Sequence, residues 1–170
     1  MNRILIIGSG GAGKSTLARR IGEVTGLPVI HLDQLHWKPN WTGTPKEEWK
    51  QTVAEVLKGE SWVMDGNFGG TMEMRLEACD TVVYLDFPRL LCLYRALKRI
   101  ITYYNKTRPD MAEGCHEKLD LEFLGWVWNF PKTTKPVIEG RLKRFETQKR
   151  IIRLRSPREV DEFLAGLRRG

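Results

Sequence analysis

The chain has 170 residues, with 28 Lys and Arg against 21 Asp and Glu, and a formal net charge of +7. Hydrophobic residues make up 41% and charged residues 29%, which excludes the composition of a disordered chain. This length suffices for one substantial core but is short for two, so we expect a single domain over residues 1–170. The basic balance favours polyanionic partners, a class that includes free nucleotides and nucleic acids alike.

The first apolar run, residues 4–7, is too short for a signal peptide or a membrane span. Three cysteines occur without a CxxC pair, which is typical of reduced thiols. We therefore expect a cytoplasmic protein with no membrane partner.

The first part of the chain alternates short apolar runs with helical patterns. Residues 3–7 stop at Gly8 and are typical of a strand buried on both faces of a parallel sheet. Apolar positions at helical spacing follow over 17–24, and the run 28–32 predicts a second buried strand that ends at Asp33. This order of strand, helix and strand implies a right-handed parallel crossover.

The middle of the chain predicts two more strands. Residues 44–47 read TPKE, a capping-box pattern that predicts a helix ending near Leu57. Buried strands are then expected over 62–65 and 81–86, and Pro88 opens a long helix with one apolar face.

The pattern breaks down between about residue 105 and residue 135, where polar residues, prolines, glycines and aromatic residues are mixed. We interpret this segment as an inserted helical lid and expect mobility there. A helix over 137–145 and a fifth strand over 151–154 follow, and a second capping box at Ser156 starts the closing helix.

Residues 8–15 read GSGGAGKS and match the phosphate-loop pattern GxxxxGK[ST] between an expected strand and helix. A polyphosphate needs converging backbone N–H groups from a loop with little side-chain bulk. We expect Lys14 to reach the β- and γ-phosphates, Ser15 to bind Mg²⁺ and Thr16 to bond a phosphate oxygen. The predicted ATP-binding residues are Gly8, Ser9, Gly10, Gly11, Ala12, Gly13, Lys14, Ser15 and Thr16.

Together these elements predict an α/β protein with the three-layer P-loop fold. A five-stranded parallel sheet is flanked by helices, with a helical lid insertion over about 105–135. The segment over about 34–60 is expected to lie on the acceptor side.

Asp33 and Asp65 each end an expected strand, and ligands of open α/β sheets bind at the carboxyl ends of the strands. A carboxylate there can hold Mg²⁺ or accept a proton from an attacking hydroxyl. We expect both as catalytic candidates, with Asp65 beside Ser15 at the metal. The alternative is that either aspartate caps the turn after its strand.

Several basic and aromatic residues are candidates for ligand contact. Arg95 and Arg99 are four residues apart on one helix face and can clamp phosphate oxygens together, so we count both as catalytic and Arg95 also as nucleotide-binding. A closing lid can bring in further arginines, although a solvated basic face is the alternative. His36 and Trp37 can stack a base or a sugar, although such residues more often pack in the core.

Four segments resemble the DNA topology modulation proteins: HLDQLHW at 31–37, DGNFGGT at 65–71, TRPDM at 107–111 and LRSPREV at 154–160. More widely, the phosphate loop, Asp65-Gly66 after the third strand and YRALKR at 94–99 resemble the adenylate-kinase and small-molecule-kinase branch of P-loop proteins. The resemblance implies ATP and Mg²⁺ as cofactors, and nucleotide contacts for Arg95 and Arg99.

The resemblance also bears on the acceptor. Adenylate kinases carry DGFPR after strand three, and Gly69 stands here in place of its phosphate-binding arginine. Arg75 is the candidate substitute, and Asp33 falls where shikimate kinases carry an acceptor-binding aspartate. The predicted acceptor-binding residues are Asp33, His36, Trp37, Arg75, Arg108 and Arg141.

These features predict a phosphotransferase that moves the γ-phosphoryl group of ATP to a small acceptor. Two alternatives stay open: a DNA-binding regulator switched by the nucleotide, and an ATPase. No common nucleic-acid module occurs in the sequence, which makes nucleic acid the less favoured partner. Asp65 and Asp86 are followed by Gly66 and Phe87, so neither precedes a glutamate that would favour hydrolysis.

Overall fold

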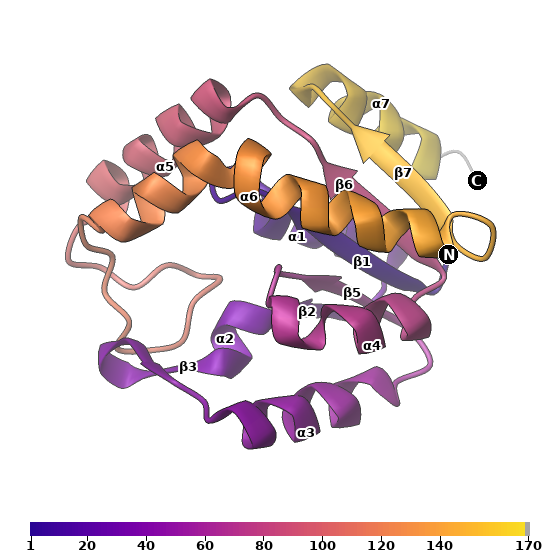
Figure 1. Ribbon diagram of the computed structural model, residues 1–170, viewed down its shortest axis with the longest axis horizontal. Helices are drawn as coiled ribbons and strands as arrows, with labels where there is room; N and C mark the ends of the chain where they lie inside the picture. Colours follow the sequence, from indigo (N-terminus) through magenta and orange to yellow (C-terminus); the bar gives the residue numbers. More distant parts are fainter. Residues whose placement is uncertain (169–170) are drawn as a thin grey trace.

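The computed structural model describes residues 1–168 and has a parallel five-stranded sheet at its centre (Figure 1). The strand order is β2-β5-β1-β6-β7. The strands are β1 (Arg3–Gly8), β2 (Val29–His31), β5 (Trp62–Asp65), β6 (Thr81–Leu85) and β7 (Arg150–Leu154). The predicted α/β class with a five-stranded parallel sheet is confirmed.

Helices cover both faces of this sheet (Figure 1). One face packs against α1 (Lys14–Thr25) and α7 (Pro157–Leu167), and the other against α3 (Lys46–Leu57), α4 (Met72–Ala78) and α6 (Leu121–Phe145). No helix within residues 1–168 combines the length and the hydropathy needed to cross a membrane.

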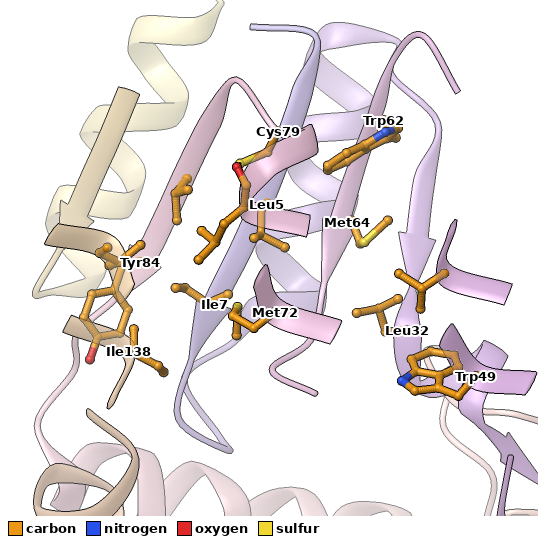
Figure 2. Packing of buried hydrophobic residues seen from close by; sticks show 14 of the residues in the cluster. Leu5, Ile7, Leu32, Trp49, Trp62, Met64, Met72, Cys79, Tyr84 and Ile138 are labelled. Atoms are coloured by element: carbon orange, nitrogen blue, oxygen red, sulfur yellow. The ribbon is translucent and has the colours of Figure 1, made fainter. Parts of the chain in front are cut away.

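The sequence of β1 is apolar because this strand lies at the centre of the sheet and is covered on both faces. Ile4 and Ile6 belong to the core on the α1 side, whereas Leu5 and Ile7 belong to the core on the α6 side. All four side chains are fully buried, because successive residues of a strand point to opposite faces. Figure 2 shows Leu5 and Ile7 beside Met72 on the second of these faces.

The segment after β2 differs from the prediction. The strand ends at His31, and Asp33 lies in the first turn of the short helix α2 (Leu32–His36). An antiparallel pair follows, made of β3 (Trp37–Lys38) and β4 (Thr42–Gly43) around the 3-10 turn η1 (Pro39–Trp41). The apolar pattern did not reveal the helix that begins at Leu32, because a buried leucine fits the first turn of a helix as well as a strand.

The two capping boxes have different outcomes. The hydroxyl of Thr44 donates to the carbonyl of His36 at 2.7 Å, so it closes the β3–β4 hairpin and does not cap α3. At α7 the prediction is confirmed, because Ser156 Oγ accepts from the Glu159 amide. The Glu159 carboxylate in turn accepts from the Arg155 amide at 2.9 Å.

The predicted lid segment has two parts. Residues 104–120, after α5 (Arg89–Tyr103), form an irregular loop closed by bridges between Tyr104 and Glu117 and between Thr107 and His116. From residue 121 the chain is helical without a break to residue 145, so no separate helix begins near 137. The side chain of Asp120 caps this helix. Its interior prolines are exposed, and the helix is held by its apolar face: Phe130, Ile138 and Leu142 pack on the sheet, and Val127 lies beside the phosphate loop.

A charge cluster holds α6 on the ends of β6 and β7. Asp86, whose side chain is 12% exposed, accepts from Lys135 at 2.7 Å and from Arg153 at 3.2 Å. Arg153 also binds Glu139 of α6 at 2.8 Å. Asp86 therefore neutralises two cations at the junction of helix and sheet.

We expect Asp86→Ala to lower the free energy of unfolding by about 2 kcal/mol, because it leaves two half-buried cations without their shared carboxylate. Urea denaturation measures this change. The control is Glu162→Ala, which removes an exposed pair with Arg158 and should change the stability by less than about 0.5 kcal/mol. Equal effects of the two substitutions would contradict the role given to Asp86.

Candidate functional site

The phosphate loop connects β1 to α1 and is pressed against two other helices. A Cβ atom at Gly11, where φ is +75°, would lie 2.1 Å from the carbonyl oxygen of Cys92 in α5. A Cβ atom at Gly10 would lie 2.5 Å from the ring of Phe123 in α6. Gly13, with φ +94°, precedes α1 without a side-chain cap, so the first N–H groups of this helix are free to bind an anion.

Lys14 lies across this loop. Its Nζ donates to the carbonyls of Gly8 and Ser9 at 3.1 and 2.9 Å. Burial lowers the pKa of Lys14, and the carboxylates of Asp65 and Asp33 act in the opposite direction. The ammonium is thus held where the loop would bring the outer phosphates of a nucleotide.

Asp65, at the end of β5, joins two other polar side chains. Its carboxylate accepts from Ser15 Oγ at 2.6 Å and contacts His31 Nδ1 at 2.5 Å. Hydroxyl and carboxylate oxygens are the ligands that Mg²⁺ prefers, and Mg²⁺ commonly takes only one or two protein ligands beside phosphates and water. Ser15 and Asp65 therefore fit the predicted metal role.

His31 was not identified from the sequence. It ends β2 and lies directly opposite Asp65 in the parallel register of β2 and β5. Burial by itself lowers the pKa of His31, but the hydrogen bond and the charge of Asp65 outweigh burial and raise it. The available signal was that two polar residues end adjacent strands.

The loop after β5 is tied to the phosphate loop by Asn67, which was also missed. Its amide nitrogen donates to the Gly8 carbonyl at 2.7 Å, and its amide oxygen accepts from the Gly8 amide at 3.2 Å. Arg75 supports this loop from beneath. Its fully buried guanidinium donates to the carbonyls of Gly66, Asn67, Phe68 and Thr71.

Of the predicted arginines, Arg95 lies next to the phosphate loop, whereas Arg99 and Arg108 share one carboxylate. Arg95 contacts the Ala12 carbonyl at 3.5 Å. Arg99 pairs with Glu117 at 3.2 Å, and Arg108 pairs with the same carboxylate at 2.7 Å. Burial lowers the pKa of Arg99, Arg108 lowers it further, and Glu117 opposes both. Glu117 is 4% exposed and was not singled out by any sequence pattern.

On the hairpin side, Trp37 Nε1 donates to Asp33 Oδ1 at 3.3 Å, and its ring centroid lies 5.6 Å from that of Trp41. Burial raises the pKa of Asp33, and Lys14 acts in the opposite direction. His36 packs against Trp37, Trp49 and Phe68, with centroid distances of 4.7 to 4.8 Å.

A cavity of about 960 Å³ lies between these groups. Of the predicted site residues it is lined by Gly10, Gly11, Ala12, Gly13, Lys14, Ser15, Thr16, Asp33, Trp37, Arg95, Arg99 and Arg108. Asp65 is buried and bonded to Ser15 of this wall. His36, Arg75 and Arg141 do not line the cavity. Arg141 donates to the Gly69 carbonyl, and the donors of Arg75 are all bonded to backbone, so direct acceptor contact by Arg75 is not supported.

The fold is shared with known kinases. A shikimate kinase from Acinetobacter baumannii, solved with shikimate, aligns over 98% of this chain and 90% of its own, with a TM-score of 0.61 at 15% identity. A shikimate kinase from Bacteroides thetaiotaomicron aligns over 99% and 97%, with 0.56 at 20%. A gluconokinase from Sinorhizobium meliloti aligns over 99% and 92%, with 0.54 at 19%. At these identities the likeness shows the fold alone.

No protein-family model matches the sequence, and no curated protein matches it. What the comparisons show is the fold that the chain shares with the shikimate kinases and the gluconokinase.

We expect Arg75→Met to destabilise the protein by about 3 kcal/mol, because four backbone carbonyls lose a buried donor. Arg141→Met removes one exposed bond in the same region and should cost less than about 1 kcal/mol. Thermal unfolding of both variants is the measurement. Unchanged stability of Arg75→Met with a raised KM for the acceptor would instead support the acceptor role.

His31→Asn tests the contact with Asp65 through its pH dependence. The folded-state pKa of His31 is raised, so the stability it contributes is full below the unfolded pKa of about 6.5 and is lost as pH rises through the folded pKa. The stability difference between wild type and variant, from urea denaturation, should therefore be larger at pH 5.5 than at pH 8.5.

His36→Asn is the matched control for that experiment. Burial lowers the pKa of His36, so its protonation opposes folding and the wild type loses stability relative to this variant as pH falls. The two variants should show opposite trends, and parallel trends would count against the assignment for His31.

Proposed function

We propose that the protein is an ATP-dependent kinase that transfers the γ-phosphoryl group to a hydroxyl of a small molecule. The observation that carries the proposal is the juxtaposition, around one cavity, of the phosphate loop with Lys14 and a half-buried carboxylate, Asp33, in helix α2. The fold shared with shikimate kinases and a gluconokinase supports a small-molecule acceptor.

In this proposal each group has a physical task. The loop amides and Lys14 bind the β- and γ-phosphates, and Arg95 and Arg99 neutralise charge that spreads over the transferred group. Ser15 and Asp65 would hold Mg²⁺, which would withdraw charge from the phosphates. Asn67 and Arg75 keep the phosphate loop and the loop after β5 in register.

Asp33 is the proposed base. The acceptor oxygen attacks the γ-phosphorus, the bond to the β–γ bridging oxygen breaks, and ADP leaves. The hydroxyl proton passes to Asp33, whose pKa is raised by burial, so it binds a proton more readily than an exposed aspartate. Trp37 orients this carboxylate through its indole N–H.

We also propose that the protein is related to the DNA topology modulation proteins. Three of the segments that carry this resemblance supply His31, Asp33, Asn67, Arg108 and Asp110, all of which lie in the site or on its supporting loops. The segments thus share a location that suits a small-molecule site. We also propose a cytoplasmic location, where free thiols persist; Cys79, Cys92 and Cys115 are buried and unpaired.

The net charge of +7 is the observation that favours the nucleic-acid alternative. ATP consumption measured with Mg²⁺ and separate pools of small hydroxyl compounds, nucleoside monophosphates and duplex DNA distinguishes the two readings. Stimulation by a small-molecule pool supports the kinase. Stimulation by duplex DNA alone would support the regulator.

Lys14→Ala should lower phosphoryl transfer by at least about 100-fold, because the outer phosphates lose their cation. A coupled assay of ADP release measures this, and calorimetry should show weaker binding of ATP·Mg²⁺. Lys58→Ala, at an exposed site on α3's carboxyl end, is the control and should leave both unchanged. Undiminished ATP affinity in the Lys14 variant would contradict the assignment of the phosphate loop.

A further inference from the structure

The part of the cavity wall that comes from residues 33–41 and 108–117 carries more acidic than basic side chains. It contains three carboxylates, Asp33, Asp110 and Glu117, and two tryptophans, Trp37 and Trp41. Within these two segments, Arg108 is the basic residue that lines the cavity. The acceptor meets this wall if the function proposed above holds, and the inference below rests on that proposal.

Arg108 is already neutralised. Its side chain is 9% exposed, its Nε lies 2.7 Å from Glu117, and its Nη1 lies 3.1 Å from Asp110. Glu117 is shared with Arg99 of α5. The three carboxylates and the two guanidinium groups sum to −1 when all are charged, so neither guanidinium of this wall is left without a carboxylate. Cavity-lining cations such as Lys118 and Arg19 lie outside the two segments.

The loop after β5 adds no cation either. Gly69 and Gly70 carry no side chain, and Arg75 is bonded to backbone carbonyls throughout. An acidic acceptor that bound Arg108 would have to displace a carboxylate from this buried guanidinium and would then lie beside Asp33. Breaking a buried pair leaves an uncompensated charge, which is strongly unfavourable.

The two indole rings offer a different kind of recognition. Trp37 and Trp41 meet edge to face at the cavity, with Trp37 anchored by Asp33 and Trp41 by the His116 carbonyl at 2.9 Å. Aromatic faces pack against the C–H surfaces of polyhydroxyl compounds and attract ammonium groups, and carboxylates accept hydrogen bonds from hydroxyl and ammonium donors.

We propose that the acceptor is a hydroxyl compound without an anionic group, either a neutral polyol or nucleoside or an amino alcohol. Its hydroxyl binds Asp33, and its body packs on Trp37 and Trp41. The inference excludes carboxylates and phosphate monoesters as preferred acceptors.

The first experiment compares three acceptor pools with ATP and Mg²⁺: shikimate, gluconate and AMP; glucose, glycerol and adenosine; ethanolamine and choline. Mass spectrometry identifies the phosphorylated product. We expect products in the second or third pool, with kcat/KM at least about 10-fold above that of any acid, the size of one lost or strained contact. A preferred acidic acceptor would overturn the inference while leaving the kinase function intact.

Absence of product in every pool would refute the proposed function, and ligand class is then read from tryptophan fluorescence. A saturable change with a neutral or amine ligand, diminished in Trp37→Phe, still supports the charge argument. A saturable change with an acid, or none with any ligand, overturns it. Arg19 and Lys118 line the cavity and form no ion pair within residues 1–168, so loss of acid binding in Arg19→Ala or Lys118→Ala would show which cation was used instead.

Asp110→Asn with Glu117→Gln tests the masking directly. These changes free Arg108, so we expect the affinity for gluconate to rise at least about 10-fold and the preference for neutral acceptors to fall. Asp110→Asn alone serves if the double variant does not fold. Glu113→Gln, at an exposed position of the same loop, is the control and should change neither. A folded variant with no gain for acids would overturn the inference.

Discussion

The backbone of the phosphate loop lies so close to helix α5 that a Cβ atom at Gly11 would collide with the helix backbone, and a Cβ atom at Gly10 would displace the Phe123 ring of α6. The Cys92 carbonyl and the Phe123 ring occupy the space into which a Cβ atom would project. This contact fixes where the loop amides point, and it ties the placement of two helices distant in sequence to the geometry of one turn. The same contact sets where Arg95 and Arg99 of α5 lie relative to the loop.

A second set of interactions registers the loop against the neighbouring strand. Asn67 pairs with both backbone groups of Gly8, and Arg75 holds the chain around Asn67 from beneath. Asp65 then receives Ser15 and His31 at the end of the same strand. These groups stabilise one another, so a substitution in any of them is expected to disturb both the folded state and the site.

The parts of the structure that rest on local pattern were predictable. The buried strands read as continuous apolar runs, and the phosphate loop has a fixed spacing that needs no tertiary information. Thr44 and Asp33 were misplaced because a capping-box pattern and an apolar run each fit more than one local structure. The packing of α6 on the sheet overrode Pro131 and Pro136, whose effect on an isolated helix would be a break.

The partners of the site residues were beyond sequence pattern. The hydrogen-bond partners of His31, Asn67 and Glu117 are separated from them by 34, 59 and 18 positions in the sequence, respectively. Only the strand order and the loop closure bring these partners together. Arg75 shows the converse. The sequence alone predicts that an arginine beside a glycine-rich loop contacts the acceptor, yet the fold buries Arg75 completely. Side-chain type and spacing suggest a chemistry, whereas burial decides which groups are left to perform it.

The unbroken helix α6 has a mechanical consequence. At 1.5 Å per residue its 25 residues span about 38 Å. Phe123, against the phosphate loop, lies about 18 Å along the helix from Lys135, where the charge cluster holds it on the sheet. The helix is therefore expected to move as one rigid body about its contact with the sheet. Residues 121–135 can leave the phosphate loop only if the helix tilts as a whole or bends at its prolines, and either motion would also drag the carboxyl end of the 104–120 loop.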